Sequence, residues 1–138
     1  MAGSLLQVEI VSPARPIFRG EAASVTAEGH DGGLGILPGH APLVALLGTG
    51  VVRVATAGNR EGGERFAIHG GFLQVLGGRA TLLVTQAIRA EEVDAGKAKA
   101  ALGKTVEALQ HPKDDADYAR LLGERRWWES QLKLAGNG

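Results

Sequence analysis

The sequence has no cysteine, which excludes disulfide bonds, thiolate nucleophiles and thiolate metal ligands and leaves the fold to depend on packing. Aromatic residues are scarce, at 4% of the chain. Neither sign of charge dominates, because 15 basic and 15 acidic residues balance, so the total charge does not favour nucleic-acid binding. Apolar side chains make up 44% of the 138 residues, which is enough to build the core of one domain with a small appendage.

No segment has the pattern of a targeting signal or a membrane span. The first residues lack a basic region and a long apolar run, so we expect no signal or transit peptide. Residues 32–52 contain no Asp, Glu, Lys or Arg and are long enough to suggest a span. Their glycines, with Pro38, His40 and Pro42, would break a helix and leave backbone groups unpaired in lipid. The sequence therefore predicts a soluble chain with no direct membrane insertion.

Residues 5–88 have the period-two pattern of β-strands. Leu6, Val8 and Ile10 alternate with Gln7 and Glu9, and similar alternation recurs up to the apolar run ATLLVTQA. Clusters rich in Gly, Pro and Asn, such as GHDGG, PGHAP and AGNREGG, separate these runs. Many short strands at close spacing predict an all-β sandwich or barrel.

The pattern becomes helical after Arg89. AEEVDAGKAKAALGKTVEALQ has apolar residues at helical spacing, and Pro112 then breaks the helix. DADYARLLGERRWWESQLKL predicts a second helix that Asp115 or Asp117 can cap. Its expected apolar face consists of Tyr118, Leu121, Leu122, Trp128 and Leu132. The short break predicts an antiparallel hairpin, which buries too little surface to be stable alone and must pack on the sandwich or on a partner.

The glycine-rich stretch around GHDGGLGILPGHAPLVALL has no recognisable active-site pattern. It contains no Walker A sequence, no GxGxxG before a helix and no GxSxG nucleophile. One interpretation is a metal site built from His30, Asp31 and His40, with His69 as a further ligand, although no HxH, HxxxH or HExxH pattern occurs. The other, which we favour, is that the glycines adopt positive φ in turns that Pro38 and Pro42 stiffen, so that no metal site is expected.

Three motifs carry a resemblance that extends over essentially the whole chain. GGLGILPGHAPL, IHGGFLQV and VEIVSPARPIFRGEAASV are similar to segments of the epsilon subunit of bacterial and chloroplast F-type ATP synthase, whose mitochondrial counterpart is called delta. In the second motif, His69 replaces the usual Ser. The resemblance implies a ten-stranded β-sandwich over residues 1–88 and a C-terminal antiparallel two-helix hairpin over residues 89–138. It also implies a non-catalytic protein.

The resemblance implies partners as well. The sandwich would bind the gamma subunit and the c-ring, and so couple ion-driven rotation of the ring to the catalytic head from the cytoplasmic face of the bacterial plasma membrane. Asp31, Leu34 and His40 are the candidate c-ring contacts; a turn-stabilising hydrogen bond is the alternative role of His40. The family often has Glu where Gly33 stands, so an acidic contact would pass to Asp31. The strand 70–75 is expected to be core and gamma-facing scaffold.

The resemblance also implies that the hairpin inhibits ATP hydrolysis when it extends along gamma to the alpha and beta subunits of the head. Arg120, Arg125, Arg126 and Lys133 are the candidate inhibitory residues, and a solvated helix face is the ordinary alternative. Trp127 and Trp128 are the candidate docking residues. Val93, Asp94, Lys97 and Ala98 stand where some members bind ATP, but Lys97 replaces the motif's Arg, which predicts weak or absent binding and no required cofactor.

Two other classes of function stay open at this point. A free-standing sandwich that binds sugars would usually have exposed aromatic residues on its strands, whereas both Trp residues lie in the second predicted helix. A histidine-metal hydrolase would require the histidines of the glycine-rich stretch to meet around one ion.

Overall fold

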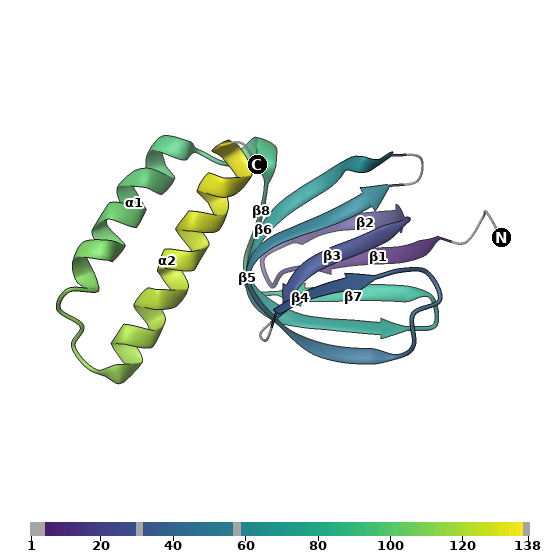
Figure 1. Ribbon diagram of the computed structural model, residues 1–138, viewed down its shortest axis with the longest axis horizontal. Coiled ribbons are helices and arrows are strands. Elements are labelled where there is room, and N and C mark those ends of the chain that lie inside the picture. Colours follow the sequence, from purple (N-terminus) through teal and green to yellow (C-terminus); the bar gives the residue numbers. More distant parts are fainter. Residues whose placement is uncertain (1–4, 30–31, 57–58, 137–138) are drawn as a thin grey trace.

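The computed structural model describes residues 5–29, 32–56 and 59–136 and consists of a β-sandwich followed by a helical hairpin (Figure 1). The strands are β1 Leu6–Val11, β2 Pro16–Ala22, β3 Ser24–Gly29, β4 Gly32–Ile36, β5 Leu43–Thr56, β6 Asn59–Leu76, β7 Arg79–Val84 and β8 Ala87–Arg89. A short 3-10 helix, η1 Ala90–Glu92, leads into α1 Ala95–Ala108 and α2 Asp115–Gly136. The expected switch from strands to helices after Arg89 is confirmed.

The strands form one hydrogen-bonded sheet that folds over itself into two layers. The order is β2-β1-β7-β6-β5-β3-β4, with β8 paired to β6, and the β1–β7 pair is parallel whereas the other pairs are antiparallel. Phe18 of β2 meets Phe66 of β6 edge to face, with ring centroids 5.9 Å apart. Because two strands separate β2 from β6 in the sheet order, this contact joins the layers across the core.

The core confirms the period-two prediction. On β1, Leu6, Val8 and Ile10 are buried and alternate with more exposed residues. The same alternation buries Leu73 and Val75 on β6. These side chains belong to one cluster that runs through both layers. The sandwich is therefore stabilised by a single continuous apolar core, as a chain without disulfides requires.

The expectation of ten strands is wrong for the described residues, which form eight. The difference lies in β5 and β6, which are 14 and 18 residues long and run through both layers as continuous strands. Gly70 and Gly71 have φ values of 75° and 147°, and they let β6 bend while its pairing with β5 continues from Leu47–Gly71 to Thr49–His69. A Cβ on Gly71 would overlap the carbonyl oxygen of Leu83.

Both helices begin at aspartate caps. The Asp94 carboxylate accepts a hydrogen bond from the backbone N–H of Lys97 at the start of α1. At the start of α2, the Asp114 carboxylate accepts from the N–H of Asp117, and the Asp117 carboxylate accepts from the N–H of Lys113. The N-cap of α2 is therefore Asp114, one residue before the expected Asp115, and the expectation of Asp115 or Asp117 is wrong. Asp117 lies in the first turn of the helix, and its carboxylate returns a hydrogen bond to the backbone before the cap.

In the hairpin, α2 lies against the sandwich and α1 packs on its outer side (Figure 1). The fully buried residues of α2 are Leu121, Trp127, Ser130, Gln131 and Leu134. The expected stripe is only partly correct, since Tyr118 is 47% exposed and Leu122, Trp128 and Leu132 are half-buried. A single-stripe prediction fails here because α2 has neighbours on two sides, the sandwich and α1, so its buried surface is wider than one stripe.

Among the described residues, no helix is both long enough and apolar enough to cross a membrane.

Candidate interaction surfaces

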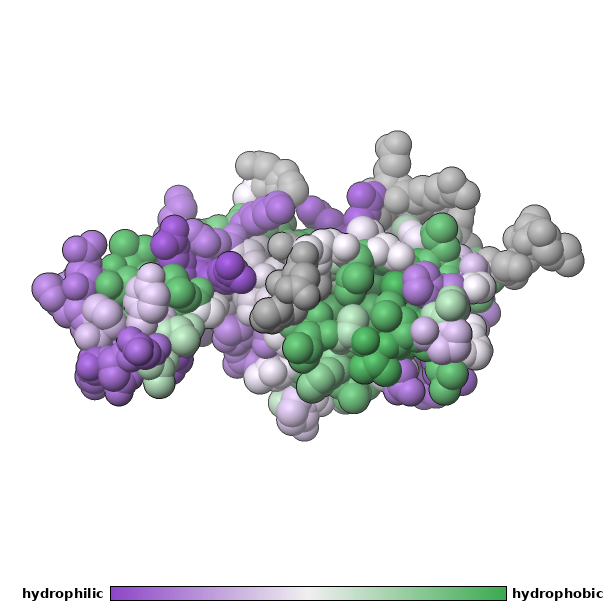
Figure 2. All heavy atoms as spheres, turned by 60° about the horizontal axis from the view of Figure 1, so that its bottom comes forward, coloured by the Kyte–Doolittle hydropathy of each residue, from purple (hydrophilic) through white to green (hydrophobic). Residues whose placement is uncertain are grey.

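An apolar row crosses the outer face of the sandwich at β5, β6 and β7. In the strand register, Leu46 lies opposite Phe72, and Phe72 lies opposite Leu83. Each of these three side chains is more than half exposed, and Val44 and Leu76 extend the exposed apolar area along β5 and β6. Figure 2 shows the resulting patch on the sandwich, whereas the hairpin surface in the same view is largely hydrophilic. We call these five residues the apolar face.

A shallow apolar groove continues the apolar face toward β1. Its lining includes Val11, Pro13, Phe72 and Leu83, and Val11 is the register partner of Leu83 on the neighbouring parallel strand. A contiguous exposed apolar surface of this kind is typical of a protein–protein contact. Phe72 lies in the strand 70–75, which is expected from the sequence to be core and gamma-facing scaffold. Its side chain is 53% exposed and is therefore not part of the core.

The glycine-rich stretch contains a tight turn at residues 37–40. The N–H of His40 donates to the carbonyl of Leu37 over 3.1 Å, and Gly39 has a φ of 84°. Proline at the second position and a positive-φ glycine at the third are the residues that a type II turn requires. The interpretation of Pro38 and Gly39 as turn-forming residues is therefore confirmed.

The candidate c-ring contacts lie near this turn. Leu34 is on β4 and packs partly against the core, whereas His40 is exposed and its Nδ1–H donates to the carbonyl of Ala41 over 2.7 Å. Hence His40 makes a local hydrogen bond and still presents its ring to solvent. Asp31 lies outside the described residues, as does His30.

The described residues contain no cluster of three or more His, Asp or Glu side chains that could hold a metal ion. His40 and His69 are engaged separately: His40 bonds within its turn, and the Nδ1 atom of His69 lies 2.9 Å from the hydroxyl of Thr49. The proposed metal ligands His30 and Asp31 are outside the described residues.

The hairpin docks on the sandwich through Trp127. This side chain is only 8% exposed, and its indole stacks on the His69 ring with centroids 5.2 Å apart and planes at 12°. Trp127 belongs to a small cluster with Leu134 and Ala67. Trp128 is half-buried beside it, with ring centroids 6.4 Å apart. We call the contact of α2 with β5 and β6 the docking contact.

The candidate inhibitory residues are divided between two environments. Arg120 forms ion pairs with Asp117 and Glu124, and Arg125 forms one with Glu129. By contrast, Arg126 and Lys133 line a groove between α2 and Thr49 of the sandwich. Because Arg126 and Lys133 are two helical turns apart, they share one face of α2. The docked hairpin therefore turns part of the expected basic face toward the sandwich.

Three of the four candidate ATP-binding residues have structural roles in this arrangement. The Asp94 carboxylate caps α1, Ala98 is fully buried, and Val93 packs against the cluster around Trp127. The side chain of Lys97 is exposed. Capping and packing thus engage three of these four side chains, and weak or absent ATP binding stays a prediction.

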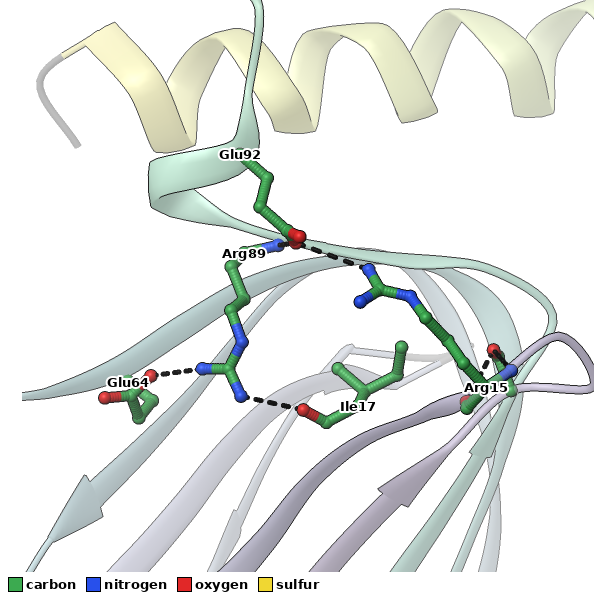
Figure 3. Close-up of polar contacts among 6 residues, drawn as sticks. Arg15, Ile17, Glu64, Arg89 and Glu92 are labelled. Atoms are coloured by element: carbon green, nitrogen blue, oxygen red, sulfur yellow. Dashed lines mark hydrogen bonds and ion pairs between the residues drawn. The ribbon is translucent and has the colours of Figure 1, made fainter.

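Arg89, at the junction between sandwich and hairpin, was not singled out from the sequence. Its guanidinium donates to the Glu64 carboxylate and to the carbonyl of Ile17, and it lies 5.1 Å from the centroid of the Phe66 ring (Figure 3). Arg89 therefore ties β8 to β2 and β6. No local motif signals this role, because the partners are 72 and 25 residues away in the sequence.

Glu92 continues this network into the linker. Its carboxylate accepts hydrogen bonds from the backbone N–H of Arg89 over 3.0 Å and from the guanidinium of Arg15 over 3.3 Å (Figure 3). The Arg89 N–H, and secondarily Arg15, lower the pKa of Glu92. Since the Arg15–Glu92 pair is about half exposed, it orients the linker more than it stabilises the fold.

Comparisons with known proteins identify the fold and the motifs. The family model described as ATP synthase, Delta/Epsilon chain, beta-sandwich domain, matches residues 5–90. The ATP synthase epsilon chain of Bordetella petrii is 46% identical over 94% of this chain and 91% of its own length. The epsilon chain of Solibacter usitatus is 37% identical, with coverage of 94% and 95%.

Solved structures agree with these relatives. A chain of the Euglena gracilis mitochondrial ATP synthase, in a cryo-EM structure that includes the c-ring, matches with a TM-score of 0.81 at 25% identity, over 96% of this chain and 81% of that chain. A chain of the Tetrahymena thermophila central stalk and c-ring structure shares the fold, with a TM-score of 0.63 at 15% identity.

The protein is thus a non-catalytic subunit of a rotary ATP synthase. More specifically, the chain belongs to the ATP synthase delta/epsilon family, in which its curated relatives are epsilon chains. The resemblance stated from the sequence motifs is confirmed, and the sugar-binding and metal-hydrolase alternatives are set aside.

Proposed function

We propose that this subunit couples rotation of the c-ring to the catalytic head through gamma, and that its hairpin inhibits ATP hydrolysis when it leaves the sandwich. The observation that carries the proposal is the combination of an exposed apolar face on the sandwich with a hairpin held by a separate, small contact. The exposed apolar face is typical of a surface that binds a partner permanently. A hairpin held by a small contact is typical of an element that can move.

The apolar face is the proposed gamma-binding surface. Leu46, Phe72 and Leu83 form a row across three hydrogen-bonded strands, so their spacing is fixed by the sheet. Burying such a row against a partner would stabilise the complex at roughly 25 cal/mol per Å² of apolar area. Rigid apolar side chains near the centre of an interface typically contribute most of the binding energy.

The loop and strand around Leu34 and His40 form the proposed c-ring contact, to which Asp31 would add a negative charge. The turn at Pro38 and Gly39 holds this loop in one conformation. A preformed loop loses little conformational entropy when it binds the polar loops of the ring.

The hairpin is proposed to act as a brake because its docking contact is independent of the sandwich core. The buried docking cluster contains Ala67, Trp127 and Leu134, whereas the core cluster consists entirely of sandwich residues. Undocking would therefore leave the sandwich folded. It would also release Arg126 and Lys133 from the groove beside Thr49, and these two cations could then meet acidic surfaces of the alpha and beta subunits.

The proposed location is the cytoplasmic face of the bacterial plasma membrane, peripheral and held there by partners. The bacterial relatives named above support this placement.

Two experiments test the two halves of the proposal. Co-purification with gamma should be abolished by Phe72→Asp, which puts a charge in the centre of the apolar face, and should persist in the control Tyr118→Asp, on the exposed side of α2. Separately, a chain ending at Val93 keeps β8 and Arg89 and should still bind gamma, but the reconstituted head should hydrolyse ATP faster with it than with the full chain. Unchanged hydrolysis would exclude the brake, and unchanged gamma binding by Phe72→Asp would exclude the surface.

A further inference from the structure

His69 lies at the centre of the docking contact, between α2 and the strands β5 and β6. One face of its ring stacks on Trp127, and Nδ1 is hydrogen-bonded to Thr49. Gly123 brings α2 close to this ring, since a Cβ there would lie 3.7 Å from the His69 Cε1 atom. A half-buried titratable ring thus lies between an element expected to move and the strands on which it docks.

Charged groups of both signs lie around the His69 ring. From α2, Glu124 faces His69 and raises its pKa, while Arg126, Glu129 and Lys133 line the adjoining groove next to Thr49. From the sheet, Thr49 contributes a neutral hydroxyl. Burial is the largest effect, and the pKa of His69 in the docked state is lowered from its ordinary 6.5.

We propose that His69 is a pH-sensitive latch, which holds the hairpin on the sandwich while its ring is neutral and releases the hairpin when the ring is protonated. The latch is a property of the isolated chain. Its consequence for ATP hydrolysis rests on the function proposed above, in which the released hairpin is the inhibitory form; acidification would then apply the brake.

The direction of the pH effect depends on whether His69 binds a proton more tightly in the docked or in the undocked state. Undocking removes Trp127 and exposes His69 to water, so its pKa returns toward 6.5. Above that value both states are neutral, and docking has its full strength. As the pH falls through 6.5 toward the lower pKa of the docked state, the undocked form gains protons and becomes favoured.

The indole face attracts a cation and so acts against this effect. In this proposal, desolvation of the charged ring outweighs that attraction, because burial is the largest effect on the pKa of His69 and lowers it.

The absence of cysteine makes a direct distance measurement possible. Cysteines introduced at Lys104 on α1 and Arg79 on the sandwich, both exposed, can carry spin labels in the isolated chain. At pH 8 we expect one distance population, that of the docked hairpin. At pH 5.5 a second population should appear. A single population at both pH values, or more docking at pH 5.5, would overturn the proposal.

Three variants separate the latch from a general effect of acid. His69→Gln should give the same distances at both pH values, whereas His111→Gln, in the exposed loop between the helices, should keep the pH dependence. Glu124→Gln should enlarge the acid-induced population, because it removes the carboxylate that counteracts burial. A pH dependence that persists in His69→Gln, or an unchanged response in Glu124→Gln, would refute the role of His69.

These measurements use neither gamma nor the catalytic head, so they stand apart from the proposed function. If the distances respond to pH through His69 but hydrolysis by the reconstituted head does not change, then the latch is correct and the brake is wrong.

Discussion

Replacing Trp127 by Ala should undock the hairpin without unfolding the sandwich. Trp127 is 8% exposed and is the largest side chain in the docking cluster, whereas the core cluster does not include it. In the undocked state its ring would lie in water. The substitution should therefore remove most of the free energy of docking and little of the free energy of unfolding of the sandwich.

The magnitude follows from the buried area. A Trp side chain buries about 150–250 Å², and at roughly 25 cal/mol per Å² this gives about 4–6 kcal/mol as an upper estimate. Because Trp→Ala substitutions at buried sites cost about 3–5 kcal/mol, we expect a loss of about 3–4 kcal/mol. Since each 1.4 kcal/mol is tenfold, docking should weaken roughly 100- to 1000-fold.

The assay is the same distance measurement between labels at Lys104 and Arg79, at pH 8, where His69 is neutral. Trp127→Ala should shift most molecules to the undocked distance, while the urea midpoint of the sandwich stays within the range of the wild type. The matched control is Tyr118→Ala, an aromatic residue of the same helix that is 47% exposed and should leave the distance unchanged. A Trp127→Ala chain that remains docked would refute the assignment of Trp127 as the main docking residue.

Four further predictions concern other parts of the fold. Gly71→Ala should destabilise the sandwich by at least about 1–3 kcal/mol in urea unfolding, because its Cβ would overlap the backbone of β7. Asp114→Ala should cost about 1 kcal/mol of helix stability, measured by circular dichroism. Arg89→Met should lower the free energy of unfolding by about 1–3 kcal/mol, since the Glu64 carboxylate and the Ile17 carbonyl lose a charged donor. Calorimetry with MgATP should show no micromolar binding, and Lys97→Arg should not create it, because neighbouring residues of the motif are packed.

Acid should loosen the start of α2 as well as the latch. The backbone N–H of Lys113, and secondarily Arg120, lower the pKa of Asp117. A lowered carboxyl pKa means that this contribution is complete above the ordinary value of 3.8 and is lost as the pH falls through it toward the lower folded value. This loss begins near 3.8, whereas the effect of His69 begins near 6.5, so the onsets of the two effects can be separated by titration.

The period of the apolar residues predicted the architecture because each layer has one buried face. Alternation at Leu6, Val8 and Ile10 can be satisfied only by a strand with one side in a core. The number of strands could not be predicted in the same way. Whether a glycine pair ends a strand or bends it depends on the partner strand, and at Gly70 and Gly71 the pairing with β5 continues.

The docking contact could be predicted only in part. The sequence placed Trp127 and Trp128 on the second predicted helix and made both candidate docking residues. It could not show that His69 would be its partner, because stacking joins residues 58 positions apart in sequence. The same holds for Arg89, whose role depends on three elements that meet only in the folded chain.

The two long strands connect the proposed partner surface with the hairpin. The beginning of β5 and the end of β6 carry Leu46 and Phe72 of the apolar face, whereas the middle parts of both strands carry residues under α2, among them Val51 and Ala67. The strands cross from one layer to the other at the bend of Gly70 and Gly71, and they keep the same register on both sides of it. Backbone hydrogen bonds therefore fix the position of the docking contact relative to the apolar face. Detachment of the hairpin would leave the strands and the apolar face in place. A subunit of this kind can therefore stay bound to one partner through the sandwich while its C-terminal helices bind another.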